Sequence, residues 1–477
     1  MEMHLTEAAR DRLHGFHNRK IGIVGLGREG VDLAQFLCAH GAQITVSDSA
    51  DAPALGMALS TLRDLPVRYL LGDQRGTDLL DCDEILVSPG VARSTPVIAQ
   101  AAAAGVPVSS ATRLYLELCP GPILAVTGSS GKTTTTMLIG NMLRAAGLPT
   151  LVGGNMGTPM LAQIEEATRS TWSVLELSSF QLEDLTQSPR VGVILNITPN
   201  HLDRHADMRE YIQAKGSLIR FQNPMDVAVL NADDAIVRSL PHDGRTAAFS
   251  LRGPVDGAWL EGNDLMLGGD IPFLDGRPPG VLPCAFLTRS EIPLRGVHNV
   301  ANVLAASAAA LSAGCLPTTI ADVVRGFRPV PHRIEIVADV DGVTYVNDSI
   351  ATSPERSMAA LASFDEPIVL IAGGRDKHLP MEEWARAIGA RAKAIVLVGE
   401  AARQIEAALK AAGAETRIEF AESFTQVVPI GCNLAQPGDI VLLSPGCTSF
   451  DEFRDFEARG VAFRAAVRDL ERQRHAG

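Results

Sequence analysis

The stretch ILAVTGSSGKTTTT, residues 123–136, constrains the fold more than any other part of the chain. A β-rich run precedes a turn of glycines and serines, and the helix-type segment TTTMLIGNMLRAAG follows it. Gly131, Lys132 and Thr133 fit the end of the phosphate-loop pattern G-x-x-x-x-G-K-[ST], whereas the first glycine of that pattern would fall at Val126. Small residues before a helix let consecutive backbone N–H groups face an anion. The stretch therefore predicts a nucleotide-phosphate loop at the end of a buried strand.

A loop of this kind holds the phosphates of ATP, and its lysine neutralises charge on the β- and γ-phosphates. The hydroxyl of the next threonine reaches Mg²⁺. We therefore expect Lys132 and Thr133 to take these two roles. The residues expected to hold ATP are Gly128, Ser129, Ser130, Gly131, Lys132, Thr133 and Thr134.

A second glycine turn lies near the start of the chain, in IVGLGREGVDL. Gly25, Gly27 and Gly30 fit G-x-G-x-x-G between an expected strand at residues 20–24 and a helix. Asp48 lies near the end of the next expected strand, QITVSD, where its carboxylate could accept hydrogen bonds from a sugar or a base. The pattern favours a diphosphate ligand, although the same glycines also suit tight packing of a helix on a strand. Further on, EILVSPGVA predicts a strand and turn that form a second wall of this site.

Two more strands are expected to end in polar residues. WSVLELSSFQLE turns polar at Glu176, and the strand in GVILNITPNHLDRH is expected to end at His201. Ligands gather at the carboxyl ends of strands in an open parallel sheet. A carboxylate and an imidazole at that edge would suit a divalent metal, although either residue alone could be a hydrogen-bonded structural group.

Three further polar residues lie on expected helices. Lys215 belongs to YIQAKGSLIRF, whose amphipathic spacing alone predicts a solvated surface lysine. Asn299 and Asn302 begin the small-residue helix in GVHNVANVLAASAAALSAG. Their amides suit either helix capping or the binding of a base.

The last third of the chain predicts another α/β domain. RIEIVADV and VTYVNDS flank the pair Asp341-Gly342, which is typical of a β-hairpin. The strands expected in PIVLIAGGRDK, AIVLVG and DIVLLSPGCTSFDEF alternate with alanine-rich helices, as in a doubly wound fold. Asp348, Lys377 and Ser449 lie at the ends of these strands. Before this domain, residues 251–293 predict an irregular hairpin region.

Length and composition limit the class of protein. A chain of 477 residues is long enough for about three domains. The net charge of −13 argues against a broad nucleic-acid surface, and no apolar run of membrane-spanning length is present. The polar first 20 residues lack the apolar core of a signal peptide. Seven scattered cysteines form no metal-binding spacing and predict reduced thiols in the cytoplasm.

The motifs, taken in order, resemble the Mur ligase family of peptidoglycan synthesis over essentially the whole chain. The blocks that carry this resemblance are GLGREG, SPGVA, TGSSGKTT, GGNMG, LELSSFQLE, NITPNHLDRH, VHNVANVLAA, VPHRIE, NDSIAT and SPGCTSFDEFRDFEARG. SSFQLE and SFDEFRDFEARG favour the branch of the family that adds D-glutamate. The block NDSIAT has Ile350 where the family often has lysine, and GSSGKTT replaces the more frequent GTNGKST.

The resemblance implies three α/β domains and an ATP-dependent amide synthesis through an acyl phosphate. A Rossmann-like domain at residues 1–111 would bind UDP-N-acetylmuramoyl-L-alanine, and a central P-loop ATPase-like domain at 112–329 would bind ATP. A Rossmann-like α/β domain at 330–477 would bind D-glutamate and close on ATP. The enzyme would be a cytoplasmic monomer that needs two Mg²⁺ ions and binds neither nucleic acid nor a membrane.

The resemblance also implies roles for single residues. The catalytic residues would be Lys132, His201 and Lys215, the last as a carbamate formed with CO₂. The Mg²⁺ ligands would be Thr133, Glu176, His201 and the carbamate of Lys215. The UDP substrate would contact Gly25, Gly27, Asp48, Ser88, Gly90, Asn155, Ser178 and Gln181. ATP would also contact Asn299, Asn302, Arg333 and Asp348, and D-glutamate would contact Thr352, Lys377, Ser449 and Phe456.

Three alternatives remain at the level of sequence. A sister Mur ligase or a folylpolyglutamate-type ligase would share the ATP chemistry and differ in the acceptor. An NAD-dependent dehydrogenase would explain GLGREG and leave the other two segments without a role. A nucleotide-binding regulator would bind ATP without catalysing a ligation.

Overall fold

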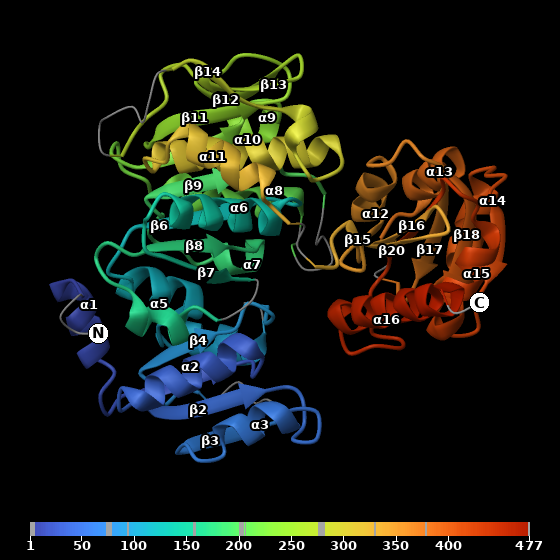
Figure 1. Cartoon of the computed structure of the whole chain (residues 1–477). Coiled ribbons are helices and arrows are strands. Elements are labelled where there is room, and N and C mark those ends of the chain that lie inside the picture. The colour runs from blue at the N-terminus through green and yellow to red at the C-terminus, as the bar shows by residue number, and fades with distance from the viewer. Residues whose placement is uncertain are drawn as a thin grey trace. The chain divides into compact units, whose positions relative to one another are not determined.

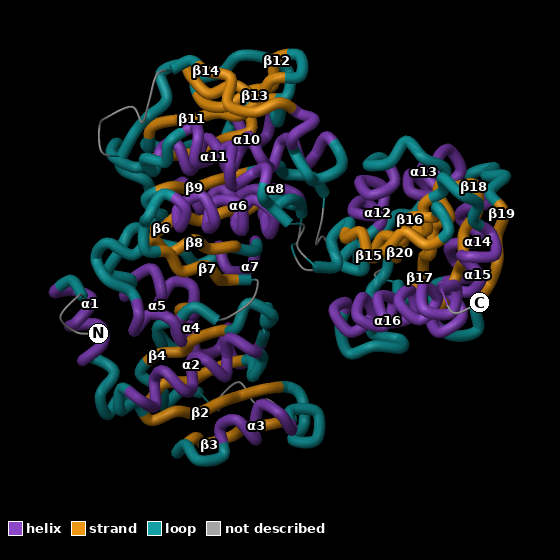
Figure 2. The backbone as a smooth tube through the Cα atoms, viewed as in Figure 1, coloured by secondary structure: helices purple, strands orange, loops and turns teal. Residues whose placement is uncertain are grey.

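The computed structural model describes residues 5–72, 79–92, 95–155, 159–199, 205, 207–274, 282–328, 331–376 and 379–475. These residues form three sheets with helices on both faces (Figures 1 and 2). The chain divides into two compact units. The first unit comprises Met1–Glu291 with Ala301–Arg325, and the second comprises Ile292–Val300 with Gly326–Gly477. The first unit contains two of the sheets and the second unit contains the third.

The N-terminal sheet is parallel throughout, with the strand order β3-β2-β1-β4-β5. Its strands are β1 (Lys20–Val24), β2 (Gln43–Asp48), β3 (Val67–Leu71), β4 (Glu84–Val87) and β5 (Val108–Ser110). Its helices are α1 (Glu7–His14), α2 (Arg28–Ala39), α3 (Gly56–Leu62), α4 (Pro96–Ala103) and α5 (Ala111–Leu118). The strands predicted at residues 20–24 and 43–48 are confirmed, and the strand order is that of a Rossmann-like domain.

Helices cover both faces of this sheet, which explains why β1 and β4 are apolar and buried without alternation after their first residues, Lys20 and Glu84. Leu33 and Leu37 of α2 are buried against one face together with Ile23 of β1. Val97 of α4 is buried with Val87 of β4 in a separate cluster. The strand ends that carry the glycine turn are therefore held by a core on either side.

The central sheet has the order β14-β13-β12-β11-β10-β9-β6-β8-β7. It is parallel from β7 to β12 and antiparallel from β12 to β14. The strands of its parallel part are β6 (Ile123–Thr127), β7 (Thr150–Gly154), β8 (Trp172–Glu176), β9 (Val191–Ile194), β10 (Val227–Asn231), β11 (Arg245–Ser250) and β12 (Gly257–Glu261). The antiparallel edge adds β13 (Asp264–Gly268) and β14 (Cys284–Thr288). Because β6 lies between β8 and β9, the loop after β6 begins in the middle of the parallel part.

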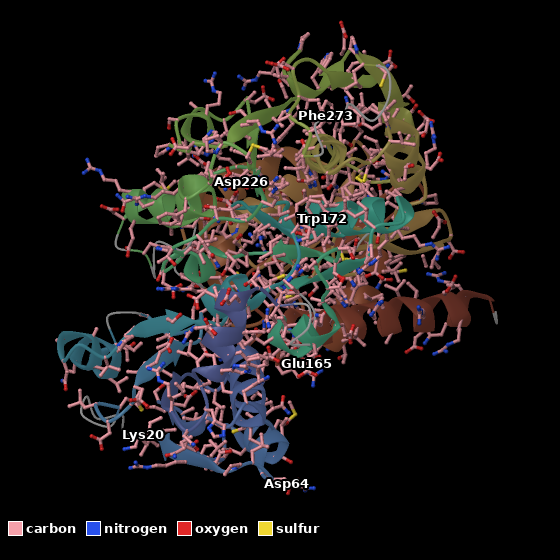
Figure 3. All side chains as sticks on the ribbon, turned by 90° about the vertical axis from the view of Figure 1, so that its left-hand side faces the viewer. Lys20, Asp64, Glu165, Trp172, Asp226 and Phe273 are labelled. Atoms are coloured by element: carbon pink, nitrogen blue, oxygen red, sulfur yellow. The ribbon has the colours of Figure 1, made fainter. Side chains whose placement is uncertain are left out.

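Helices flank this sheet, and α6 packs beside α11 (Figure 1). The helices are α6 (Lys132–Ala145), η2 (Leu161–Glu166), α7 (Ser179–Leu182), α8 (Met208–Arg220), α9 (Ala235–Arg238), η3 (Arg289–Glu291), α10 (Val297–Ser312) and α11 (Pro317–Arg325). Figure 3 shows Trp172, the first residue of β8, well above Lys20 and Asp64 of the N-terminal domain.

Two predictions for this region have opposite outcomes. The irregular hairpin expected at residues 251–293 is confirmed by the antiparallel pairs β12–β13 and β13–β14, apart from residues 275–281, which lie outside the described residues. The expectation that a strand runs to His201 is wrong, because β9 ends at Ile194. The segment after β9 leaves the strand ladder, and Asn196 in it contacts the phosphate loop, as described below.

The C-terminal sheet has the order β15-β16-β20-β17-β18-β19 and is parallel except for the hairpin β15–β16. Its strands are β15 (Glu335–Val340), β16 (Val343–Asn347), β17 (Ile368–Gly373), β18 (Ala392–Val398), β19 (Arg417–Phe420) and β20 (Ile440–Gly446). Its helices are α12 (Pro354–Leu361), α13 (Glu382–Arg391), α14 (Ala402–Ala411), η4 (Phe424–Gln426), α15 (Val427–Leu434) and α16 (Phe456–His475).

The hairpin predicted at Asp341-Gly342 is confirmed. Both residues have positive φ, at 55° and 79°, as a two-residue type I′ turn requires. Strands with helices on both faces confirm the prediction of a doubly wound third domain, so the fold consists of three α/β domains. Among the described residues, no helix is long and apolar enough to cross a membrane.

Candidate active site

The loop after β6 has the geometry of a phosphate cradle. Gly131 adopts the left-handed conformation (φ 83°), and a Cβ added there would lie 2.2 Å from Oδ1 of Asn302. Only glycine fits this position, because it must both turn the chain and leave room for the amide. Lys132, the first residue of α6, folds back so that its Nζ donates to the carbonyl oxygens of Gly128 (2.8 Å) and Ser129 (3.3 Å). The lysine ammonium therefore lies over the loop whose N–H groups begin the helix.

The adjoining strand places a carboxylate beside this loop. Glu176 ends β8, next to β6 in the sheet, and is almost fully buried. Its Oε2 accepts a 2.7 Å hydrogen bond from Oγ1 of Thr133, and its Oε1 accepts one of 2.9 Å from Nδ2 of Asn155. Thr133 and Glu176 thus meet as predicted, and a hydroxyl with a carboxylate is an oxygen donor set that suits Mg²⁺. These residues fit a magnesium ion.

Lys215 is buried, so the surface position that its helix spacing predicts is wrong. From α8 its Nζ donates to the carbonyl oxygen of Gly128 at 2.9 Å and contacts Oγ1 of Thr127 at 3.4 Å. The same ammonium lies 4.8 Å from the centre of the Tyr211 ring, one helical turn earlier. Amphipathic spacing identifies one face of α8 and cannot tell that this lysine faces the phosphate loop. Lys215 and Lys132 therefore converge on one carbonyl oxygen.

Two residues around the loop were not predicted as site residues. Asn196 accepts a hydrogen bond from the Ser130 N–H through Oδ1 (2.9 Å) and donates to the Ser130 carbonyl through Nδ2 (3.2 Å). The Tyr211 hydroxyl lies 2.9 Å from Oγ of Ser129. Asn196 is the first residue of the block NITPNHLDRH, and Tyr211 precedes Lys215 by four residues on one helix. These positions were the only signals in the sequence.

The glycine turn of the N-terminal domain is built from the predicted residues. Gly25 has φ 93°, and its carbonyl oxygen accepts a 2.7 Å hydrogen bond from Oγ of Ser88, which follows β4 just before Gly90. Gly30 packs so closely that an added Cβ would lie 2.0 Å from the Gly25 carbonyl oxygen. Around Gly27, an added Cβ would meet no atom within 4 Å. The turn is therefore closed on its inner side and open at Gly27.

Asp48 contributes to this turn through its carboxylate. Oδ2 accepts from the backbone N–H of Leu26 at 2.6 Å, and Oδ1 accepts from the N–H of Ala50 at 2.9 Å. Each oxygen keeps further acceptor capacity, since an ionised carboxylate has about four lone-pair positions. Asp48 thus fixes the turn and still presents a carboxylate beside it.

Ser178 and Gln181 form a capping box at the start of α7, which begins shortly after Glu176, the last residue of β8. Gln181 accepts at Oε1 from the N–H of Ser178 (2.9 Å) and from its Oγ (3.1 Å). Nε2 of Gln181 donates to Oε1 of Glu29, at the start of α2, over 2.7 Å. These residues lie within the first unit, so both of its domains contribute to this cluster.

The two predicted asparagines of α10 are both buried. Nδ2 of Asn299 donates to the Arg295 carbonyl oxygen at 2.7 Å, whereas Asn302 lies against Gly131 of the phosphate loop. Asn299 belongs to the second unit and Asn302 to the first. Asn302 therefore lies at the phosphate loop, and Asn299 contacts the residue Arg295 just before its own helix.

In the second unit, Asp348 follows β16 and is buried beneath the loop that carries Arg333. Its Oδ2 accepts from Oγ of Ser444 (2.9 Å) and its Oδ1 accepts from the N–H of Ile334 (3.2 Å). Burial raises the pKa of Asp348 to about 7, while Ser444 and Arg333 oppose that rise. On either side of Arg333, His332 (φ 65°) and Ile334 (φ 45°) adopt left-handed conformations that cost energy for residues with a Cβ. Backbone strain of this kind is typical of functional loops.

A buried arginine that was not predicted as a site residue holds the proposed D-glutamate loops together. Arg459 donates to Oγ and O of Ser349 (both 3.0 Å), and to the carbonyl oxygens of Thr448 and Cys447 (both 3.2 Å). Burial lowers its pKa to about 10. It thereby ties the loop of Thr352 to the loop of buried Ser449. Only its place in the block SFDEFRDFEARG marked it in the sequence.

Phe456, the first residue of α16, lies on the same side of this domain. Its carbonyl oxygen accepts from Oγ of Ser349 (2.8 Å), and its ring meets that of His332 edge-on at 6.3 Å. The predicted residues His201 and Lys377 lie outside the described residues. Arg375 forms a two-way backbone bridge with Thr448, so the strand-end loops that precede Lys377 and Ser449 are neighbours.

Comparison with protein families agrees with this geometry. Three family models match the chain: the Mur ligase MurD-like N-terminal domain at residues 19–110, the Mur ligase middle domain at 126–310, and the Mur ligase glutamate ligase domain at 332–447. Together they cover most of the chain. The chain belongs to the Mur ligase family.

Two relatives illustrate how far the similarity extends. This Mur ligase is 41% identical to the UDP-N-acetylmuramoylalanine–D-glutamate ligase of Symbiobacterium thermophilum, over 94% of this chain and 98% of the relative. It is 40% identical to the protein of the same name from Pelotomaculum thermopropionicum, over 96% of this chain and 100% of the relative.

Among solved structures, the UDP-N-acetylmuramate-alanine ligase of Thermotoga maritima matches with a TM-score of 0.59 and 20% identity, over 95% of this chain and 100% of that one. The folylpolyglutamate synthase of Mycobacterium tuberculosis matches with a TM-score of 0.52 and 15% identity, over 76% and 92%. These two structures share the fold.

Proposed function

We propose that this Mur ligase adds D-glutamate to UDP-N-acetylmuramoyl-L-alanine at the expense of ATP, in the synthesis of peptidoglycan precursors. The observation that carries this proposal is the convergence of Lys132, Lys215 and the pair Thr133–Glu176 on one phosphate loop. The near-full-length similarity to D-glutamate-adding relatives favours this acceptor over those of the sister ligases. The enzyme is an acid–amino-acid ligase that forms ADP, and we place it in the cytoplasm as a monomer.

The three domains divide the binding of substrates. We assign residues 1–111 to the UDP substrate, 112–329 to ATP and 330–477 to the incoming amino acid. In the first of these, the open backbone at Gly27 and the start of α2 suit a diphosphate, since unpaired N–H groups point out of a helix N-terminus. Gly25, Asp48, Ser88 and Gly90 would contact the same ligand, and Asn155, Ser178 and Gln181 would contact its muramoyl-alanine part.

The reaction proceeds in two displacements. The terminal carboxylate of the UDP substrate attacks the γ-phosphorus of ATP, and the bond to the β-phosphate oxygen breaks to release ADP. The amine of D-glutamate then attacks the acyl carbon, loses a proton, and phosphate departs as the amide forms. The ammonium of Lys132 would offset negative charge on the transferring phosphoryl group, and Mg²⁺ would supply further positive charge there when bound. Thr133 and Glu176 would hold one ion and His201 the second. Asn299, Asn302, Arg333 and Asp348 would hold the adenosine and phosphates of ATP.

Lys215 would act as a carbamate. Its neutral amine adds to CO₂ and releases one proton, which turns a potential cation into an anion with two oxygens. The observed contact with Gly128 supports this role, because it places Nζ at the phosphate loop rather than in solvent. An ammonium in that position would repel a bound Mg²⁺, whereas a carbamate would attract it.

The acceptor site would consist of Thr352, Lys377, Ser449 and Phe456. Ile350 supplies no charge to a glutamate carboxylate. Lys377 with the two hydroxyl groups still provides a cation and donors for two carboxylates. A charge-assisted hydrogen bond contributes about 1.5–3 kcal/mol. The absence of a lysine at 350 would therefore raise KM for D-glutamate and leave the identity of the acceptor unchanged.

The test is phosphate release from ATP in the presence of UDP-N-acetylmuramoyl-L-alanine and a panel of amino acids. We expect release only when both the UDP substrate and D-glutamate are present, together with a product whose mass has increased by one glutamyl residue. Comparable turnover with L-glutamate, D-aspartate or a diamino acid would contradict the acceptor assignment. Phosphate release at the same rate with and without an amino acid would contradict the assignment to any amino-acid ligase.

A further inference from the structure

An acidic residue occupies the glycine turn that is expected to bind a diphosphate. Glu29 is the second residue of α2 and lies between Gly27 and Gly30. An acid in the first turn of a helix stabilises that helix through the helix dipole, which is the simplest explanation for its presence. The carboxylate is unfavourable for an anionic ligand, because like charges repel, whereas the preceding Arg28 offers the opposite charge. The contacts of Glu29 indicate a second role.

The carboxylate of Glu29 is directed at the central domain. Its Oε1 accepts the 2.7 Å hydrogen bond from Nε2 of Gln181, and its Oε2 is buried without a hydrogen-bond partner among the described residues. Gln181 is almost fully buried, and its Oε1 is already committed to Ser178. The amide of Gln181 is therefore held at both ends, by Ser178 on its own helix and by Glu29 on the other domain. Without Glu29, only the oxygen end would be held.

A second carboxylate on the same face of α2 contacts the neighbouring element. Asp32 follows Glu29 by three residues, so the two side chains lie on one side of the helix. Oδ2 of Asp32 accepts from the backbone N–H of Leu161, the first residue of η2, at 3.1 Å. Glu29, Asp32 and Gln181 line one small pocket together with Gly154, which precedes Asn155. The start of α2 thus contacts η2, which follows Asn155 in the sequence, and α7, which follows Glu176.

We infer that Glu29 is a positioning residue for the UDP substrate, which it serves by fixing the amide of Gln181 between the glycine turn and the start of α7. This inference rests on the proposed function, which places Gln181 against that substrate. Glu29 acts through Gln181 and has no part in phosphoryl transfer. Its loss should therefore weaken binding of the UDP substrate and leave turnover at saturation nearly unchanged.

Three variants separate this role from a merely structural one. Glu29→Ala removes the acceptor, Glu29→Gln keeps an acceptor oxygen in the same place, and Gln181→Ala removes the group that Glu29 holds. Glu165→Ala is the matched control, because Glu165 is an exposed glutamate on η2 in the same unit (Figure 3). Glu29→Met, which keeps the side-chain length without an acceptor, replaces Glu29→Ala if the alanine variant does not fold.

The experiment is calorimetric titration of the full chain with UDP-N-acetylmuramoyl-L-alanine, with KM and kcat for phosphate release measured in parallel. For Glu29→Ala we expect a Kd about 10-fold higher than that of the wild type, which corresponds to about 1.4 kcal/mol. Its KM for ATP and its kcat should stay within about 2-fold, since the hydrogen bond of the Glu29 side chain goes to Gln181 and Glu29 has no assigned part in phosphoryl transfer. Glu29→Gln should restore most of the affinity, and Glu165→Ala should match the wild type.

The double variant Glu29→Ala/Gln181→Ala decides whether the two residues act together. If Glu29 acts through Gln181, the double variant binds no more weakly than Gln181→Ala alone. Additive losses, a wild-type Kd for Glu29→Ala, or a Glu29→Gln variant as weak as the alanine variant would each overturn the inference. Because the titration does not depend on turnover, a chain that binds the UDP substrate without ligating D-glutamate would refute the proposed function alone. A wild type that does not bind the UDP substrate would refute both.

Discussion

The glycine turn at residues 25–30 and the phosphate loop at 128–133 share one local design and differ in the charged residues at the start of the helix. Each joins a buried parallel strand to the start of a helix through a left-handed glycine. The helix after the phosphate loop begins with Lys132, whose ammonium lies over the loop. The helix after the glycine turn begins with the exposed Arg28, which Glu29 follows directly. Backbone N–H groups at a helix start suit a diphosphate that is only bound, whereas transfer of a phosphoryl group also needs a cation fixed over the loop. We therefore expect substitutions in the two turns to fail in different ways.

The largest expected effect is that of Lys132→Ala. Loss of the cation nearest the phosphoryl group should lower kcat by about 10³-fold, because a single preorganised donor contributes about 10²–10³ in rate and this one is also charged. Phosphate release under saturating substrates measures it. Lys410→Ala, at an exposed lysine, serves as the control. If folded Lys132→Ala turned over substrate at nearly the wild-type rate, the phosphate loop would not need its cation for catalysis, and the proposed difference between the two turns would be wrong.

The second-largest expected effect is that of Lys215→Ala. This variant should lower kcat by about 10²-fold, because it loses the proposed anionic ligand of Mg²⁺. Added acetate should restore part of the activity by filling the vacant anion site, and removal of CO₂ and bicarbonate should reversibly lower the activity of the wild type. Acetate should have no such effect on Lys132→Ala, which lacks a cation. Rescue of Lys132→Ala by acetate, or full activity of Lys215→Ala, would show that the carbamate assignment is wrong.

Two glycines of the N-terminal turn give a smaller, paired effect. Gly27→Ala meets no atom in the protein, so its free energy of unfolding should change by less than about 0.5 kcal/mol, whereas its Kd for the UDP substrate should rise about 10-fold. Gly30→Ala places a Cβ 2.0 Å from the Gly25 carbonyl oxygen. It should lower the free energy of unfolding by about 2 kcal/mol or more and also weaken binding. Denaturant unfolding and titration separate the two outcomes. Unchanged binding in Gly27→Ala would place the diphosphate elsewhere.

The last expected effect is a pH dependence of stability, about as large as the loss of stability in Gly30→Ala. Burial raises the pKa of Glu29 to about 7, and the negative charge of the neighbouring Asp32 adds to this rise. Burial also raises the pKa of Asp32, to about 6. Between the ordinary glutamate pKa of 4.5 and about 7, the folded chain binds more protons at Glu29 than the unfolded chain. The free energy of unfolding therefore falls as the pH rises through that window.

Replacement of Glu29 by glutamine should remove part of that slope. Relative to its value at pH 5, the free energy of unfolding at pH 8 should fall less in Glu29→Gln than in the wild type, by about 1–3 kcal/mol. Urea unfolding at both pH values provides the measurement, and Glu165→Gln is the control. Equal slopes in the wild type and Glu29→Gln would mean that Glu29 titrates as an exposed glutamate does.

The sequence could predict the parts of the site that are local in the chain. The strands that end at Val24 and Thr127 and the hairpin at Asp341-Gly342 follow from short patterns whose physics is complete within a few residues. The meeting of Thr133 with Glu176 was expected from the family resemblance, and the structure explains it by the neighbouring parallel strands β6 and β8.

Contacts between distant segments could not be predicted in this way. The burial of Lys215 depends on which way α8 faces the sheet, and spacing within the helix carries no such information. Arg459 reaches residues 110 positions away, and Glu29 and Gln181 are 152 positions apart. Such pairs depend on how the layers pack, which no single-sequence pattern records.

The most direct test of the division between the two turns is the Kd of Lys132→Ala for UDP-N-acetylmuramoyl-L-alanine, measured without ATP. We expect a Kd within about 2-fold of the wild type in a variant whose turnover has fallen about 10³-fold, because the substrate diphosphate would be held by the glycine turn and Gln181. A Kd raised 10-fold or more by the loss of Lys132 would contradict it, since the cation of the phosphate loop would then bind the UDP substrate as well.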